Sequence, residues 1–89
     1  MTRAAEMVRE AGGLFISDEV QAGFCRTGCW WGYEAMGFIP DVVTMGKPMG
    51  NGLPLAGAVA RIELVDAFRK KTRYFNTFAS SPLQAAVGM

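Results

Sequence analysis

Histidine is absent from the chain, and Cys25 and Cys29 are its only 2 cysteines. A structural zinc site draws four ligands from cysteine and histidine, so these two residues cannot complete one. We therefore expect no bound metal, and we expect reduced thiols, as is usual in the cytosol.

Long apolar runs and strong net charge are also missing. No stretch approaches the roughly 18 to 20 apolar residues of a transmembrane helix, and the N-terminus lacks the charged-then-apolar layout of a signal peptide. The 9 basic and 8 acidic side chains leave a net charge of +1, which is too weak to attract nucleic acid or an anionic membrane. The sequence predicts a cytoplasmic protein that binds neither nucleic acid nor membrane.

Apolar residues are abundant. Of the 89 residues, 51% are hydrophobic and only 19% are charged. A domain of this length buries only roughly 60% of the surface that its unfolded chain exposes. So many core-forming residues in so short a chain indicate a piece of a larger body.

Helix and strand signals alternate along the chain. Helices are expected at 4–11, at 62–69 with a basic end, and from 82 onwards; strands are expected at 14–17, 41–45 and 55–60. Between the first two strands, 23–40 predicts a folded loop with one helical turn near 34–36. Near-continuous apolar strands are typical of a sheet covered on both faces. The pattern predicts an α/β fold.

Two of the predicted strands deliver reactive side chains at their C-terminal ends. Asp18 follows the first strand, and Lys47 follows the second inside a cluster of glycines. In α/β sheets this edge is where ligands bind. An amine that can capture a carbonyl, together with a carboxylate, is the minimum of a pyridoxal phosphate site.

Lys47 has two other interpretations. A phosphate-binding P-loop is excluded, because Pro48 stands where that motif needs serine or threonine. A solvated surface lysine stays open. Pro48 predicts extended backbone at Lys47, which is more constraint than a solvated loop needs.

Glu19 makes an adjacent pair with Asp18, and paired carboxylates can hydrolyse glycosidic bonds. Neighbouring residues of a strand point to opposite faces, so these two would not flank one scissile bond. We therefore set hydrolysis aside. A separate anion site is expected where the hydroxyls of Thr77 and Ser80 precede the helix start at Ser81.

Four blocks of the chain resemble, in the family's order, the class III aminotransferases, which are pyridoxal 5′-phosphate (PLP) enzymes of the aspartate aminotransferase fold. The blocks are 18–28, 40–47, 50–54 and 76–78. The resemblance covers nearly all of the chain from Gly13 onwards. It implies that residues 1–89 are part of a PLP-binding large domain of fold type I, truncated at both ends, with a mostly parallel sheet and covering helices.

The resemblance implies roles for five residues. Lys47 matches the catalytic lysine that forms a Schiff base with PLP and then moves the substrate proton. Asp18 matches the carboxylate that pairs with the pyridinium nitrogen, and Val20 and Gln21 match contacts to the ring face and to its phenolic oxygen. Thr77 matches a threonine that contacts the cofactor phosphate from the neighbouring subunit. A homodimer with shared active sites is therefore implied.

The implied activity is transamination, from a small-molecule amine or amino acid to a keto acid or aldehyde. Residues 46–52 and 74–78 resemble the branch that contains phospho-lyases, so elimination of phosphate from an ethanolamine-phosphate-like substrate stays open. A third hypothesis is a non-catalytic fragment, because several of the family's active-site groups lie outside these residues. No role is assigned to the loop residues Arg26, Trp30, Trp31 and Tyr33.

Overall fold

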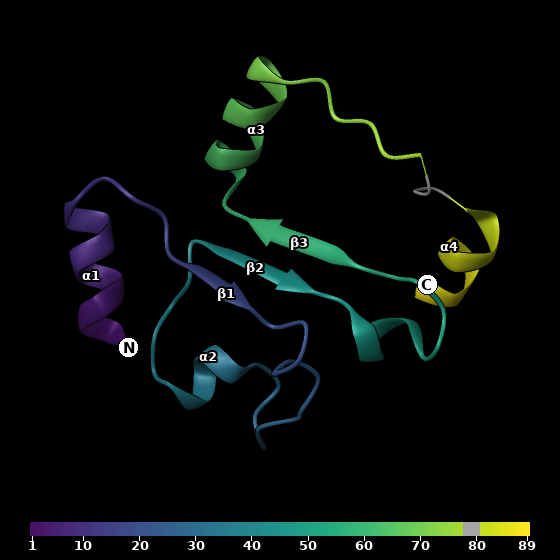
Figure 1. The fold of residues 1–89 in the computed structure, drawn as a ribbon, viewed down its shortest axis with the longest axis horizontal. Coiled ribbons are helices and arrows are strands. Elements are labelled where there is room, and N and C mark those ends of the chain that lie inside the picture. Colours follow the sequence, from purple (N-terminus) through teal and green to yellow (C-terminus); the bar gives the residue numbers. More distant parts are fainter. Residues whose placement is uncertain (78–80) are drawn as a thin grey trace.

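The computed structural model describes residues 1–77 and 81–89 as a three-stranded sheet with helices around it (Figure 1). The strands are β1 (Ile16–Asp18), β2 (Val42–Met45) and β3 (Gly57–Ala60). The helices are α1 (Thr2–Glu10), α2 (Gly32–Ala35), α3 (Ile62–Lys71) and α4 (Pro82–Gly88), and a 3-10 helix, η1 (Lys47–Gly50), follows β2. The predicted α/β class is confirmed.

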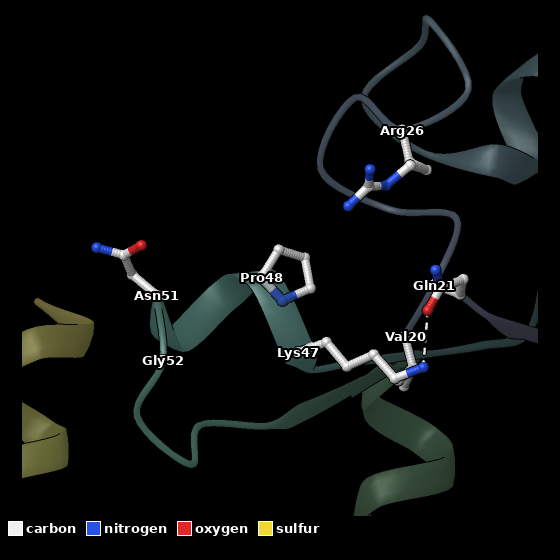
Figure 2. Close-up of a pocket in the computed structure, with 7 residues that line it drawn as sticks. All are labelled: Val20, Gln21, Arg26, Lys47, Pro48, Asn51 and Gly52. Carbon is white, nitrogen blue, oxygen red and sulfur yellow. Dashed lines mark hydrogen bonds between the residues drawn. The ribbon is translucent and has the colours of Figure 1, made fainter.

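The sheet is mixed, in the order β1-β2-β3. β1 and β2 run parallel, with Ile16 opposite Val42, and the connection over 19–41 is long enough for the crossover that a parallel pair needs. β3 runs antiparallel to β2, because η1 and the turn after it reverse the chain. The segments that follow β1 and β2 therefore leave at one edge, where Gln21 and Lys47 lie side by side (Figure 2).

α1 ends where the glycine pair predicts. Gly12 has a φ of +79°, a left-handed conformation that glycine adopts without steric cost. Its N–H donates to the carbonyl of Arg9 at 2.9 Å, and the N–H of Gly13 donates to the carbonyl of Val8 at 2.8 Å. These two bonds form a Schellman motif, which satisfies the last carbonyls of the helix and turns the chain towards β1.

β1 begins two residues later than expected, because Phe15 has other partners. Its backbone N–H donates to Oδ2 of Asp41 at 2.9 Å. Its ring packs edge-on against Phe38, with 5.2 Å between the ring centroids. Phe38 is buried, so Phe15 belongs to a small aromatic cluster beside the sheet.

Apolar side chains of the sheet are exposed in the part of the chain that the structure describes. Ile16 is 57% exposed and Val59 is 59% exposed. The Cα radius of gyration is 14.9 Å, against about 12 Å for a compact domain of this length. The surface area of 6930 Å² likewise exceeds the roughly 5100 Å² of a compact monomer of this size. Apolar strands here face outwards from a flat body.

α3 carries its basic residues in the last turn, as predicted, where positive charge favours the negative end of the helix dipole. Leu64 and Val65 are half-buried, whereas Phe68 is exposed and lies beside Tyr74, with 6.4 Å between the ring centroids. Across residues 1–77 and 81–89, none of the helices has both the length and the apolar character that crossing a bilayer requires.

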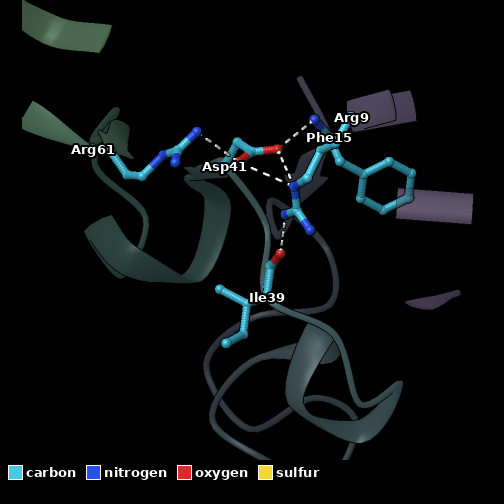
Figure 3. Close-up of polar contacts among 5 residues, drawn as sticks. All are labelled: Arg9, Phe15, Ile39, Asp41 and Arg61. Atoms are coloured by element: carbon cyan, nitrogen blue, oxygen red, sulfur yellow. Dashed lines mark hydrogen bonds and ion pairs between the residues drawn. The ribbon is translucent and has the colours of Figure 1, made fainter. Parts of the chain in front are cut away.

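Asp41, just before β2, holds three segments together (Figure 3). Its Oδ2 accepts from the Phe15 N–H at 2.9 Å and from Nε of Arg9 at 3.0 Å, and its Oδ1 pairs with Nη2 of Arg61 at 3.0 Å. Arg9 also donates to the carbonyl of Ile39. The buried carboxylate thereby joins α1, the start of β1 and the start of α3 to the central strand.

Replacing Asp41 with asparagine should lower the Tm at neutral pH, because Arg9 and Arg61 lose their anionic partner. The Phe15 amide and then the Arg9 and Arg61 guanidinium groups hold the pKa of Asp41 below its usual 3.8. A carboxyl whose pKa is lower in the folded than in the unfolded protein stabilises the fold at any pH above its unfolded-state pKa. This stabilisation is lost as the pH falls through its folded-state pKa. The Tm difference between the wild type and D41N should therefore narrow at acid pH.

Thermal unfolding followed by circular dichroism from neutral pH to about pH 2.5 measures this difference. Asp66 is exposed on α3, so D66N is the matched control and should leave the Tm unchanged. A gap between the wild type and D41N that stays constant across this range would contradict the assigned role of the charge.

Candidate active site

A pocket of about 430 Å³ lies where the chain leaves β1 and β2 (Figure 2). It is lined by Val20, Gln21, Arg26, Lys47, Pro48, Asn51 and Gly52. Because β1 and β2 are parallel, both of their C-terminal ends reach this edge, which is where α/β sheets bind ligands. The structure thus brings the two strand ends that the sequence singled out to one edge of the sheet.

Lys47 and Gln21 are the central pair of the pocket. Nζ of Lys47 donates to Oε1 of Gln21 at 2.7 Å, a short distance typical of a hydrogen bond from a charged donor. In Figure 2 the lysine side chain extends from η1 past Val20 towards Gln21. The structure therefore brings together three of the five predicted site residues.

The backbone at Lys47 is not extended, and that prediction is wrong. Its φ of +43° lies in the left-handed region, which few residues other than glycine adopt. The chain must reverse immediately after β2, and η1 does so with the Met49 N–H donating to the carbonyl of Gly46 at 3.2 Å. This turn overrides the preference that Pro48 imposes on its predecessor. Such strain, of order 1 to 3 kcal/mol, is found most often at functional sites.

Asp18 lies at the margin of the pocket and does not line it. Its Oδ1 accepts from the Val20 N–H at 3.1 Å and from Oγ1 of Thr44 at 3.2 Å, so the side chain is held against both strands. Within the described residues its Oδ2 has no partner. The exposed carboxylate can accept a further hydrogen bond beside Val20.

Glu19 faces the opposite side from Asp18, as expected of neighbours on a strand, and is only 1% exposed. Its Oε1 accepts from Oγ of Ser17 at 2.7 Å and from the Tyr33 N–H at 3.0 Å, and its Oε2 accepts from the Gly32 N–H at 2.7 Å. Sequence reasoning missed this role. The one available signal was that a second carboxylate turned towards the covered side of a strand needs several donors.

The loop between β1 and α2 packs tightly around Glu19. A Cβ on Gly32 would lie 2.8 Å from the Cβ of Ala22, and a Cβ on Gly23 would lie 2.8 Å from the carbonyl oxygen of Glu19 and 3.0 Å from the Trp31 ring. No larger residue fits at either glycine without displacing its neighbours. The predicted folded loop with one helical turn is confirmed, and it carries Arg26 to the pocket.

The loop's aromatic residues differ in exposure. Trp30 is exposed, Trp31 packs within the loop against Phe24, and the ring of Tyr33 packs against Phe38. Burial, followed by the nearby carboxylates of Glu34 and Glu19, raises the pKa of the Tyr33 phenol. Trp31 and Tyr33 therefore hold the loop in shape.

Thr77 does not line the pocket that holds Lys47. It lines a separate hollow of about 1220 Å³ between the start of β3 and α4, together with Tyr74 and Ser81. α4 begins after Ser81, as predicted, although the Ser81 side chain makes no capping hydrogen bond. Ser80, the other hydroxyl of the expected anion site, lies outside the described residues. The contact of Thr77 with a second subunit stays a prediction.

Removing the Glu19 carboxylate should destabilise the protein and loosen the loop. Glu19→Ala leaves the Gly32 and Tyr33 N–H groups without their acceptor, at a cost of about 1 to 3 kcal/mol for each buried donor. Glu19→Gln should cost less, because one oxygen remains to accept. Urea unfolding measures both variants, with Glu63→Gln, exposed on α3, as the control. Equal unfolding free energies for E19A and E63Q would refute this role.

Residues 1–89 match the family model of the class III aminotransferases. The chain is 45% identical over 89 residues to alanine–glyoxylate aminotransferase 2 homolog 2, a mitochondrial protein of Arabidopsis thaliana, covering 100% of the chain and 18% of that protein. It is 48% identical over 85 residues to ethanolamine-phosphate phospho-lyase homolog 1 of Caenorhabditis elegans, covering 92% of the chain and 18% of that protein.

A solved structure has the same fold. A phospholyase from Arthrobacter in complex with phosphoethanolamine superposes with a TM-score of 0.87 at 53% identity, over 94% of this chain and 20% of that one. The chain thus spans about a fifth of the proteins it matches. The donor set at the pocket fits PLP chemically, since Lys47 offers an amine, Asp18 an anion and Val20 an apolar contact. The chain belongs to the class III aminotransferases, a family of PLP-dependent enzymes of fold type I.

Proposed function

We propose that this chain forms the cofactor-binding edge of a PLP-dependent transaminase, which transfers an amino group from a small-molecule amine or amino acid to a keto acid or an aldehyde. The observation that carries the proposal is the hydrogen bond between Nζ of Lys47 and Oε1 of Gln21, at 2.7 Å, on the edge shared by β1 and β2. Family membership supports the same chemistry.

Lys47 has two tasks in this proposal. Its amine would hold the cofactor covalently. Once freed by the substrate, the amine would take the proton from the substrate's amine-bearing carbon and deliver it to the cofactor carbon that the lysine had held. Bound PLP supplies an electron sink for the negative charge that develops at that carbon. Gln21 orients the lysine, because its amide oxygen accepts directly from Nζ.

Asp18 and Val20 hold the ring in the same proposal. The Asp18 carboxylate is fixed through Oδ1 by Val20 and Thr44, which leaves Oδ2 to accept from a protonated ring nitrogen. An anion beside that nitrogen keeps it protonated and so strengthens the electron sink. Val20 is half-buried and provides the apolar contact to the ring face.

The quaternary structure is part of the proposal. Thr77 lines a hollow apart from the pocket that holds Lys47, and a contact with the phosphate of a neighbouring subunit would require such a separation. We place the protein in the cytoplasm as a homodimer with shared active sites.

Elimination of phosphate is the second candidate function. Two phospho-lyases share 48% and 53% identity with the chain over 92% and 94% of its length, beside 45% over the whole chain for the plant aminotransferase. Both reactions begin with the proton that Lys47 removes. They diverge at the neighbouring carbon, where a phosphate leaving group makes elimination possible.

Reduction with borohydride tests the lysine assignment. When the full-length protein is loaded with PLP and reduced, peptide mass spectrometry should find the cofactor on Lys47. K47A should lose both the label and the yellow colour, whereas K70A, changed on exposed α3, should keep them. A label on a different lysine, or a colourless wild type, would sink the proposal.

Product analysis separates transamination from elimination. The transaminase should convert amine only when a keto acid or aldehyde acceptor is present, and it should release no inorganic phosphate from phosphoethanolamine. Phosphate released in step with substrate loss, without any acceptor, would reject the first candidate in favour of the second. Chromatographic assay of the keto product and colorimetric assay of phosphate measure the two outcomes.

A further inference from the structure

We propose that Arg26 determines the substrate class of this site, by binding an anionic group, phosphate or carboxylate, on the amine that enters the pocket. The inference rests on the proposed function and adds to it. It concerns a residue to which neither the sequence motifs nor the family resemblance gives a role.

The charges of the pocket have one sign. Of the 7 residues that line it, Arg26 and Lys47 are charged, and both are cations. No lining residue is acidic. The Asp18 carboxylate lies at the margin of the pocket and not in the described lining. Cationic side chains on a concave lining attract anions.

Arg26 is the cation that is left for substrate. Lys47 already donates to Gln21 and is the proposed point of cofactor attachment. Arg26 is exposed, and within residues 1–77 and 81–89 it makes no ion pair or hydrogen bond. Arg9 and Arg61, in contrast, both pair with Asp41. A guanidinium group without a partner presents a planar fork of donors that matches phosphate and carboxylate oxygens.

Hydrogen bonds within the loop hold the backbone on either side of Arg26. The Cys25 N–H donates to the carbonyl of Trp30 at 3.3 Å, and the Gly28 N–H donates to the carbonyl of Cys25 at 3.2 Å. Figure 2 shows the guanidinium reaching from the loop towards Pro48, which also lines the pocket. Arg26 therefore faces the space that a substrate tail would occupy beyond Lys47.

A competing assignment is that Arg26 binds the phosphate of the cofactor. The two assignments differ in what they predict for one variant. If Arg26 binds substrate, Arg26→Gln raises the KM of anionic amines and leaves the dissociation constant of PLP unchanged. If it binds the cofactor, the PLP dissociation constant rises, and neutral and anionic amines lose activity to the same extent.

The test uses the full-length protein loaded with PLP and three amines: phosphoethanolamine, β-alanine and the neutral-tailed propylamine. R26Q should raise the KM for one or both anionic amines about tenfold to a hundredfold, as loss of a charge-assisted hydrogen bond predicts. The KM for propylamine should change less than about twofold. A loss confined to phosphoethanolamine identifies phosphate, and a loss confined to β-alanine identifies carboxylate.

Controls separate binding from folding. R26K should recover part of the affinity, because it keeps the charge and loses the fork. R3Q removes an arginine from exposed α1 and should behave as the wild type.

Equal loss for propylamine and for the anionic amines, or a raised dissociation constant for PLP without discrimination among the amines, would overturn this inference alone. A wild-type protein that takes up no PLP would overturn both this inference and the proposed function.

Discussion

The parallel pairing of β1 with β2 is the constraint on which the site depends. Its last rung is the Glu19 N–H, which donates to the carbonyl of Thr44 at 2.8 Å, one residue beyond the end of β1. Because the pairing continues to this point, the chain leaves β1 and β2 at the same level along the strand direction. Lys47 and Gln21, 26 residues apart, can then meet within hydrogen-bonding distance. An antiparallel pair would place these two segments at opposite edges.

The adjacent carboxylates of Asp18 and Glu19 have different roles, because successive side chains of a strand point to opposite faces. Asp18 is exposed and has one oxygen available for a ligand. Glu19 is buried, and both of its oxygens accept hydrogen bonds, from Ser17, Gly32 and Tyr33. A buried carboxylate is tolerated only with such satisfaction. The result is a rigid loop directly beside a carboxylate that is free for ligand, so stability and binding are assigned to neighbouring residues.

Element types follow from local signals, and so they could be predicted: the glycines after α1 end it, and Ser81 with Pro82 begins α4. The strand ends with Lys47 and Asp18 could likewise be predicted from position alone. The left-handed backbone of Lys47 could not, because the turn after β2 decides it. Nor could the burial of Glu19, whose donors lie 13 and 14 residues further along the chain. Interactions between segments that are distant in the sequence determine both the backbone of Lys47 and the burial of Glu19.

Positively charged side chains lie at both ends of β2, but only those at its start pair with a carboxylate of the chain. At its start, Arg9 and Arg61 both pair with the buried Asp41 carboxylate, which offsets one of their two positive charges and holds α1 and α3 to the strand. At its end, Arg26 and Lys47 lie in a pocket without an acidic lining residue. Cations gathered on the lining of a hollow raise the local concentration of anions there. The Asp18 carboxylate lies at the margin of this pocket and not among its described lining residues, so the cations of the lining remain available to an anionic ligand.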